Sequence, residues 1–353
     1  PTLDTPNWLP FVLEEQRACR HDVVVFDQTS FAKFVLKGSD ALQVLDRLCA
    51  NRVDVGVGRM VYTGMLNERG GFESDLTITR VAANEFFLVT GSAQATRDFA
   101  WIERHIRADE HAALVDVTSA YSVVSLMGPR AEDLLRRLSP DDLSKPALPF
   151  SMTRMVDVGY ARVRAARMSY VGGPGFEFYV STDQCATLYD ALCDAGQEFG
   201  LRDAGYYTID ALRIEVGRRA WGAELSPDET PLEAGLAYAV ALGKPVDFIG
   251  RNALLQQRER GVTKRLVQLT LDDPDAFPWG GEPFLMDGRY VGELTSAAYS
   301  RALGRAVAFG YAKSPDPSSP LADSMIDEAR YAVDIAGVRT AATAHRTVQS
   351  TVQ

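Results

Sequence analysis

The sequence predicts an α+β protein of two or three lobes that ends in an antiparallel β-barrel or jelly-roll. The chain has 353 residues, which is long for a single hydrophobic core. Over residues 1–258, short strand-like runs alternate with amphipathic helical stretches, which predicts the α+β part of the protein. From Lys264 onward, helical periodicity is weak and glycine-containing turns separate short apolar runs, so residues 259–353 are predicted to form a barrel domain.

Each element is predicted from hydrophobic periodicity and from the turn residues that flank it. Apolar residues three and four apart mark helices, as with Leu45 and Leu48 behind the helix cap Ser39 and Asp40. Residues 139–149 are rich in Pro, Asp and Ser and are interpreted as a surface connection. In chain order, the predicted strands are 23–26, 30–36, 86–90, 121–127, 163–170, 176–180, 266–271, 283–286, 290–294 and 306–311, and helices are predicted around Phe99 and Leu134 and over 188–199 and 208–216.

Composition and charge narrow the class of protein. A net charge of -10 argues against a nucleic-acid partner, because phosphate binding needs a basic face. No apolar run reaches membrane-spanning length, and residues 1–10 lack a secretory signal pattern, so we expect a cytoplasmic enzyme without a membrane partner. Scattered cysteines and histidines predict buried free thiols and no metal site. Residues 1–6 read like a linker, which suggests a part of a longer protein.

The most informative stretch is 66–80. It opens with a polar turn, reverses at Gly70 and Gly71, which can take positive φ, and continues as alternating apolar residues and threonines. Asp75 is expected where the turn meets the strand. A carboxylate there is fixed in direction yet able to meet a ligand, so Asp75 is a candidate proton-handling or amine-orienting group. The local pattern also allows a plain β-hairpin in which Asp75 caps its own turn.

A second stretch, 170–177, holds three glycines and a proline between two predicted strands. Such a loop lets backbone approach a flat ligand, and Glu177 at the start of the next strand could accept a bidentate donor pair. A pterin edge presents such a pair. The alternative is a loop built only for turning, with Glu177 exposed to solvent.

Arg213, Arg218, Arg219 and Trp221 form a basic and aromatic cluster at the end of a predicted helix. The cluster could receive the carboxylates of an acidic ligand, although arginine near a helix C-terminus also stabilises the helix dipole without any ligand. Tyr62 is a further candidate near a predicted turn. The residues alone therefore support a lobed α+β enzyme with a pocket between its lobes.

Together these stretches resemble the aminomethyltransferase family, the T-protein of the glycine cleavage system. The similarity is greater still to the folate-binding C-terminal half of dimethylglycine dehydrogenase, sarcosine dehydrogenase and dimethylglycine oxidase. The motifs that carry the resemblance lie, in order, at 26–34, 48–51, 66–79, 170–177, 211–215, 219–222, 231–236, 248–251, 295–296 and 308–311.

The resemblance implies a three-lobed cloverleaf with tetrahydrofolate in its central hole, in which residues 1–258 form two interleaved α+β lobes. It places Asp75 near the folate N10 and gives Glu177 the role of holding the pterin, which Tyr170 would line. Arg213 and Arg219 are looser cofactor-binding candidates, and we add Tyr62 and Trp221 to them. T-proteins usually carry two adjacent acids where this chain has Ser74 and Asp75, which argues against the lipoyl-carrier reaction.

The implied reaction is transfer of the methyl-derived carbon of an N-methylated amine, of the dimethylglycine or sarcosine type, to give 5,10-methylenetetrahydrofolate. The expected context is the folate part of a flavin-dependent oxidoreductase, with a flavin domain or subunit as partner, because no dinucleotide fingerprint is present. One alternative is a stand-alone demethylase or methyltransferase that gives 5-methyltetrahydrofolate. A second is a non-enzymatic iron–sulfur assembly protein, which is disfavoured because the corresponding segment, 243–251, has no cysteine.

Overall fold

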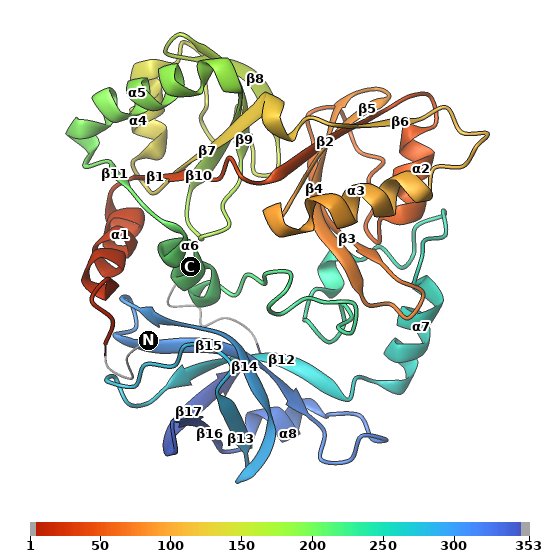
Figure 1. Cartoon of the computed structure of the whole chain (residues 1–353), viewed down its shortest axis with the longest axis vertical. Coiled ribbons are helices and arrows are strands. Elements are labelled where there is room, and N and C mark those ends of the chain that lie inside the picture. The colour runs from red at the N-terminus through yellow and green to blue at the C-terminus, as the bar shows by residue number, and fades with distance from the viewer. Residues whose placement is uncertain (1–4, 347–353) are drawn as a thin grey trace.

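Three lobes surround a central helix in the computed structural model, which describes residues 5–346 (Figure 1). Helix α6 (Tyr206–Glu215) lies in the middle and contacts helix α1 (Leu9–His21) and the third lobe. The predicted α+β class, three-lobed cloverleaf and C-terminal barrel are confirmed. Residues 1–4, and with them most of the linker-like start, lie outside the described residues, as do residues 347–353.

The first lobe is a six-stranded sheet whose outer face is covered by two helices. The helices bury Leu134, Leu135, Leu188 and Leu192 against apolar residues of the sheet, and this burial is the main stabilising term for such a layer. The strands, in spatial order, are β11 (Arg202–Asp203), β1 (Val24–Asp27), β7 (Tyr121–Met127), β10 (Gly175–Ser181), β9 (Ala161–Arg167) and β8 (Thr153–Val158), with helices α4 (Ala131–Leu138) and α5 (Cys185–Gly196).

The second lobe is an antiparallel five-stranded sheet, again with two helices on its outer face. The chain enters this sheet directly after β1 and returns to the first sheet at β7, so the two lobes are interleaved. The strands, in spatial order, are β3 (Met60–Leu66), β4 (Phe72–Ala82), β5 (Glu85–Thr90), β2 (Ala32–Lys37) and β6 (Ala113–Asp116), with helices α2 (Ala41–Leu48) and α3 (Ala95–Arg104).

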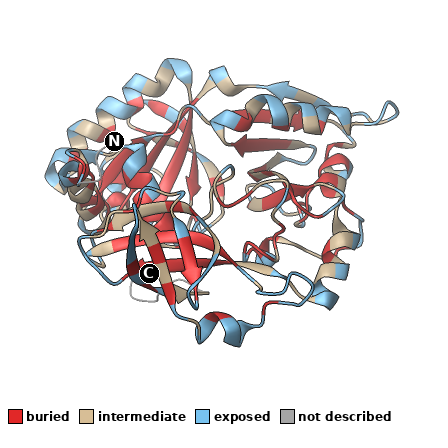
Figure 2. Cartoon of the chain, turned by 60° about the horizontal axis from the view of Figure 1, so that its bottom comes forward, coloured by how far each residue is buried: buried red, intermediate tan, exposed pale blue. Residues whose placement is uncertain are grey.

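The inner faces of the two sheets meet each other. Phe87 of β5 packs edge-on against Tyr179 of β10, with ring centroids 5.3 Å apart, and Met60, Val89 and Val123 join the same cluster. Figure 2 shows the buried strands inside each lobe and the exposed outer faces of the helices. Alternate residues of β4 and β10 therefore point either to a helix-covered core or toward the other sheet.

The third lobe is a closed barrel in which every strand pair is antiparallel. Neither β16 nor β17 is predicted from the sequence, and for β17 the reason is an Ala- and Thr-rich run that lacks the bulky apolar residues that mark a strand. In barrel order the strands are β12 (Lys264–Leu271), β15 (Arg305–Lys313), β14 (Arg289–Ser300), β13 (Pro283–Met286), β16 (Tyr331–Ile335) and β17 (Val338–His345), and helix α8 (Asp323–Asp327) contacts β17.

Several local predictions are corrected by the structure. Asp40 does precede helix α2, but its carboxylate accepts the backbone N–H of His111 (2.6 Å) rather than capping the helix. The 139–149 segment is not only a surface connection, since Leu143 and Leu148 join the core of the first lobe. Helix α7 (Arg251–Arg260) spans the division after residue 258, which stays a prediction.

Within the described part of the chain, no helix combines the length and apolar character needed to cross a membrane.

Candidate functional site

Asp75 lies inside strand β4 and not at the turn. The β3–β4 turn is held by Asn67, whose side-chain oxygen accepts the backbone N–H groups of Arg69 and Gly71 at 2.9 and 3.1 Å. The turn therefore has its own cap, and the alternative in which Asp75 caps it is wrong. Of the two glycines only Gly70 takes positive φ (85°), while a Cβ at Gly71 would lie 1.9 Å from the carbonyl oxygen of Pro227.

The register of β4 directs Asp75 toward the first sheet. Leu76 and Ile78 are buried under the helices of the second lobe, so Asp75 and Thr77 face the opposite way. Gly64 lies opposite Asp75 on β3, and the Phe72 ring fills the place of its side chain, since a Cβ there would lie 2.7 Å from that ring. The sequence thus places a polar group on the inner face of a sheet whose other face is a core.

The Asp75 carboxylate has a hydrogen-bond donor but no cation. The Tyr62 hydroxyl donates to it at 3.0 Å, and no lysine or arginine among the described residues pairs with it. Burial raises the pKa of Asp75 to about 6, although the bond from Tyr62 and the amide of Gln94 act in the opposite direction. A carboxyl with a pKa near 6 can both accept and return a proton close to neutral pH.

Glu177 lies on the inner face of the first sheet, as Asp75 lies on the inner face of the second. It is the third residue of β10, on the same face as Tyr179, and only 3% of its surface is exposed. The predicted alternative of an exposed Glu177 is therefore wrong. Its carboxylate accepts the Tyr179 hydroxyl at 2.7 Å and has no cationic partner among the described residues. Burial raises the pKa of Glu177 to about 7.

The glycine-rich loop joins β9 to β10 as predicted and carries Tyr170 into the same region. The Tyr170 hydroxyl donates to the carbonyl oxygen of Arg219 at 2.8 Å. Burial raises the pKa of Tyr62, and Asp75 and Tyr170 raise it further. Asp75 likewise adds to the raised pKa of the buried Tyr170. These effects indicate that the three side chains lie close together. The structure thus brings together Asp75, Tyr62 and Tyr170 from three separate parts of the sequence.

Arg213 is satisfied within the protein. Its guanidinium pairs with Glu224 at 2.6 Å and donates to the Ser296 hydroxyl at 2.7 Å, and the residue is 3% exposed. Asp210 accepts its Nε at 3.1 Å. Arg213 therefore links helix α6 to the barrel, and the predicted cofactor-binding role has no support from these contacts.

Arg219 and Trp221 lie nearer the central region. Arg219 donates to the carbonyl oxygens of Ala234 (2.9 Å) and Gly217 and has no carboxylate partner among the described residues. Trp221 donates to the carbonyl oxygen of Phe72 at 3.4 Å, and Arg97 lies 4.9 Å from the centre of its ring. Arg213 is therefore engaged inside the protein, whereas Arg219 keeps a guanidinium without a carboxylate partner among the described residues.

Sequence reasoning missed Tyr238, which follows by two residues the 231–236 motif of the family resemblance. Tyr238 is 67% exposed. It contributes upward shifts to the pKa values of both Tyr62 and Arg219, which indicates that it lies near both side chains. An exposed aromatic ring beside the tyrosines of the site is suited to stacking on a flat ligand. Its position just beyond a Pro- and Gly-containing motif is the one sequence signal that could have found it.

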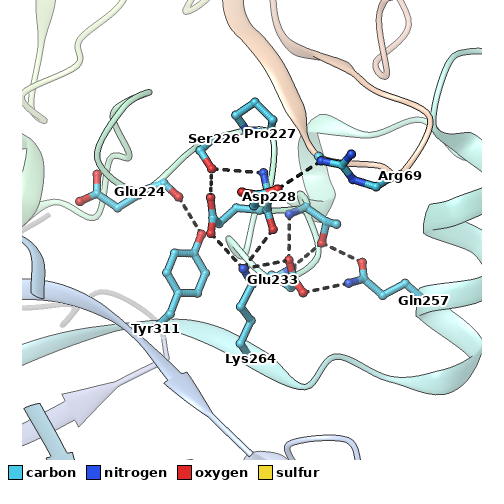
Figure 3. A network of polar contacts seen from close by, with 12 residues as sticks. Arg69, Glu224, Ser226, Pro227, Asp228, Glu233, Gln257, Lys264 and Tyr311 are labelled. Atoms are coloured by element: carbon cyan, nitrogen blue, oxygen red, sulfur yellow. Dashed lines mark hydrogen bonds and ion pairs between the residues drawn. The ribbon is translucent and has the colours of Figure 1, made fainter. Parts of the chain in front are cut away.

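A polar network fastens the hairpin that carries Asp75 to the barrel (Figure 3). Lys264, the first residue of β12, pairs with Glu229 at 2.9 Å and donates to the carbonyl oxygen of Asp228 at 3.0 Å. Arg69 of the hairpin turn pairs with Asp228 at 3.2 Å, and the Tyr311 hydroxyl donates to the carbonyl oxygen of Glu224 at 2.8 Å. The second lobe, the 224–233 loop and the barrel are thereby joined.

Two cavities lie away from these residues. The larger, about 310 Å³, is lined by Trp101, His105 and Arg251 among others, between α3 and the start of α7. The smaller, about 120 Å³, lies beside Trp8 and Trp279. The candidate site is therefore defined by its side chains, and not by either cavity.

The fold and the site define a three-lobed protein in which the inner faces of two sheets carry carboxylates without cationic partners among the described residues. The chain matches the GCVT N-terminal domain over residues 2–244 and the glycine cleavage T-protein C-terminal barrel domain over residues 264–349. It belongs to the glycine cleavage T-protein, or aminomethyltransferase, family, whose members bind tetrahydrofolate.

Several relatives show the range of this family. The chain is 39% identical to the mitochondrial pyruvate dehydrogenase phosphatase regulatory subunit of Mus musculus, in a match that covers 96% of this chain and 40% of the relative. It is 38% identical to human mitochondrial dimethylglycine dehydrogenase over 88% of its length and 36% of the relative. It is 35% identical to the aminomethyltransferase of Symbiobacterium thermophilum over 85% of its length and 81% of the relative.

The same fold is present in a solved structure. The aminomethyltransferase T of the Bartonella henselae glycine cleavage system superposes with a TM-score of 0.83 over 97% of this chain and 89% of that one, at 23% sequence identity. The chain spans about two fifths of the length of the regulatory subunit and dehydrogenase relatives.

Proposed function

We propose that this chain binds tetrahydrofolate between its two sheets and transfers to it the one-carbon unit derived from an N-methylated amine. The observation that carries the proposal is the pair of inner-face carboxylates, Asp75 and Glu177, neither of which has a cationic partner among the described residues. Carboxylates that are buried, as Glu177 is, or half-buried, as Asp75 is, are ordinarily paired. Two without a cation, on facing sheets, fit a ligand rich in N–H groups.

The residues fit tetrahydrofolate group by group. Glu177 offers a carboxylate to the paired N–H donors of a pterin edge, and such a pair binds in a bidentate manner. Tyr170 and Tyr238 offer aromatic faces, and Arg219 supplies a positive charge with no internal carboxylate partner. The Nε2 atom of Gln94 is buried and has no acceptor among the described residues, which leaves a donor beside Asp75.

Asp75 is the proposed proton-handling group. When bound, tetrahydrofolate supplies the two amine nitrogens that take up the one-carbon unit. Asp75 orients the amine beside it and accepts the proton released as the carbon–nitrogen bond forms, while its negative charge stabilises the cationic stage. Tyr62 fixes the direction of the carboxylate through its 3.0 Å hydrogen bond.

The proposed donor is a methylated amine of the dimethylglycine or sarcosine type, and the proposed product is 5,10-methylenetetrahydrofolate. Support comes from the similarity to dimethylglycine and sarcosine dehydrogenases. The oxidation that frees the carbon needs a two-electron acceptor, which a flavin can supply, so we propose a flavin-containing domain or subunit as partner. A stand-alone reaction that gives 5-methyltetrahydrofolate is the competing proposal, and a bound flavin in the full-length protein would exclude it.

Calorimetric titration with tetrahydrofolate tests the proposal. Wild type should bind saturably, Glu177→Ala should lose at least about tenfold in affinity, which is 1.4 kcal/mol, and Glu103→Ala, an exposed glutamate of α3, should bind as wild type. A folded wild-type chain that does not bind would overturn the proposal. It would favour a regulatory role instead, since one relative is a regulatory subunit of a phosphatase.

A further inference from the structure

Aromatic side chains from three parts of the chain line the smaller of the two cavities. This cavity, of about 120 Å³, lies where the start of α1, the first turn of α6 and the connection between β12 and β13 come together. Trp8 precedes α1, Tyr207 belongs to α6, and Phe277 and Trp279 lie in the connection. Tyr207 is 60% exposed and Trp279 is 42% exposed. Exposed aromatic groups that gather around one hollow are typical of a ligand-binding site.

Three of the rings stand nearly at right angles to one another. The plane of Trp8 is inclined by 67° to that of Phe277 and by 77° to that of Trp279, and the planes of Phe277 and Trp279 are inclined by 72°. Tyr207 stacks on Trp8, with ring centres 4.5 Å apart. Rings arranged in this way present their surfaces from several directions, as the walls of an aromatic cage do around a methylated ammonium group.

The walls of this cage are held in place by contacts within the protein. The Glu282 carboxylate accepts the backbone N–H groups of Trp279 at 2.6 Å and of Gly280 at 2.8 Å, which fixes the connection that carries Trp279. The stack with Tyr207 fixes the ring of Trp8 in the same way. The cage is therefore formed before a ligand arrives, so binding does not have to order these side chains.

Asp210 gives the cavity a negative charge. It follows Tyr207 by one turn of α6, and none of the described residues that line the cavity is a lysine or an arginine. Arg213 pairs with Asp210 at 3.1 Å and also with Glu224 at 2.6 Å, so two carboxylates share one guanidinium and a negative charge remains. The Asp210 side chain is 60% exposed and can meet a cation that enters from solvent.

We propose that this cavity is a binding site for a small compound with a tertiary or quaternary methylammonium group. The aromatic surfaces attract the cation through the ring quadrupoles, and Asp210 balances its charge. The site is separate from Asp75 and Glu177, since neither of them lines the cavity. The inference rests on the proposed function only for the source of the ligand, because a protonated N-methylated amine belongs to this chemical class.

The test is an NMR titration of the full chain with choline, followed on the tryptophan indole N–H signals, which single Trp→Phe variants assign. Choline should bind saturably and shift the signals of Trp8 and Trp279, but not that of Trp101, which lines the other cavity. The neutral tert-butyl analogue, in which carbon replaces the ammonium nitrogen, should bind at least about fivefold more weakly. Asp210→Asn should also weaken choline binding, whereas Asp109→Asn, at an exposed aspartate outside the cavity, should bind as wild type.

Variants of one wall separate the cage from a plain apolar hollow. Trp279→Leu keeps an apolar side chain but removes the ring, so choline affinity should fall by at least about fivefold, and Trp279→Phe should retain most of it. Phe277→Leu replaces Trp279→Leu if that variant does not fold.

Two results would overturn the inference. Absence of saturable choline binding by folded wild type would exclude the site, and equal binding of choline and its neutral analogue would assign the cavity to an apolar side chain of a protein partner. Choline binding by a chain that does not bind tetrahydrofolate would uphold the inference and reject the proposed function, so the two failures are distinguishable.

Discussion

Two regions of this protein with buried or half-buried charges differ in how those charges are compensated. At the junction of α6 with the barrel, Arg213 pairs with Glu224 at 2.6 Å, and Arg20 pairs with Glu215 at 2.7 Å. On the inner faces of the two sheets, Asp75 and Glu177 accept only tyrosine hydroxyls as direct hydrogen bonds within the described chain. The junction is complete by itself, whereas the sheet faces retain carboxylates with unused acceptor capacity.

We interpret the paired charges as structural, and the proposed function assigns the uncompensated carboxylates to a ligand. A paired buried charge is costly to break and holds elements in register. An unpaired buried carboxylate costs stability, shows a raised pKa and persists where a ligand or a reaction uses it. Arg213 has the internal partners of the first group, and its cofactor-binding role stays a prediction.

The largest expected effect is at the junction. Glu224→Ala should lower the free energy of unfolding by about 3–5 kcal/mol, because it removes the buried carboxylate beside Arg213 and leaves only the exposed Asp210 to balance its charge. Chemical denaturation measures this change. Glu198→Ala, which removes an exposed ion pair with Arg137, is the control and should change stability by less than about 1 kcal/mol. A small loss in Glu224→Ala would remove the distinction between the two regions.

Asp75→Asn tests the second region through catalysis. The amide keeps the shape but cannot accept a proton, so the rate of one-carbon transfer should fall by about 10²–10⁴-fold while tetrahydrofolate affinity is retained. A transfer assay with formaldehyde as carbon donor, corrected for the uncatalysed reaction, measures the rate. Full transfer activity in a variant that binds normally would exclude Asp75 as the proton-handling group.

The pH dependence of stability should sharpen the contrast. Both inner-face carboxyl groups bind a proton more tightly in the folded chain than in the unfolded one, since their pKa values rise from 3.8 to about 6 for Asp75 and from 4.5 to about 7 for Glu177. Their contribution to stability is therefore complete below about pH 4 and is lost as the pH rises through 7. Unfolding of wild type beside Asp75→Asn/Glu177→Gln, from pH 4 to 8, measures it. A double variant with the same slope as wild type would contradict this assignment.

The smallest expected effect is at Tyr62. Tyr62→Phe removes the hydroxyl that favours the ionised form of Asp75, so the pKa of Asp75 should rise and the acid limb of the transfer-rate profile should move to higher pH. The transfer rate above that limb should change little. Tyr160→Phe, at a fully exposed tyrosine, serves as the control. An unchanged or lowered acid limb would mean that Tyr62 does not support the carboxylate.

Much of the fold and two of the site residues could be predicted because they follow local patterns. The hairpin of Asp75 and the loop before Glu177 combine turn residues with strand periodicity, and both lie where expected to within a few residues. The strand β17 could not be predicted, since its apolar positions are mostly alanine. Its place is set by pairing with β12 and β16.

The roles of the arginines could not be predicted from sequence. Arg213 donates a hydrogen bond to Ser296, which lies 83 residues further along the chain. No local sequence pattern predicts such a contact. The exposure of Tyr238 and the position of Gln94 beside Asp75 likewise follow from how the lobes and loops come together. Sequence pattern identifies groups capable of chemistry, whereas tertiary packing decides which of them are already satisfied.

The most direct test of the central claim measures two properties of Glu177→Gln. The amide keeps the size of the side chain and removes the buried, uncompensated charge, so at pH 8 the free energy of unfolding should rise while tetrahydrofolate affinity falls by at least about tenfold. A gain in stability with a loss of binding would identify Glu177 as a charge kept for a ligand. A loss of stability with unchanged affinity would contradict the account.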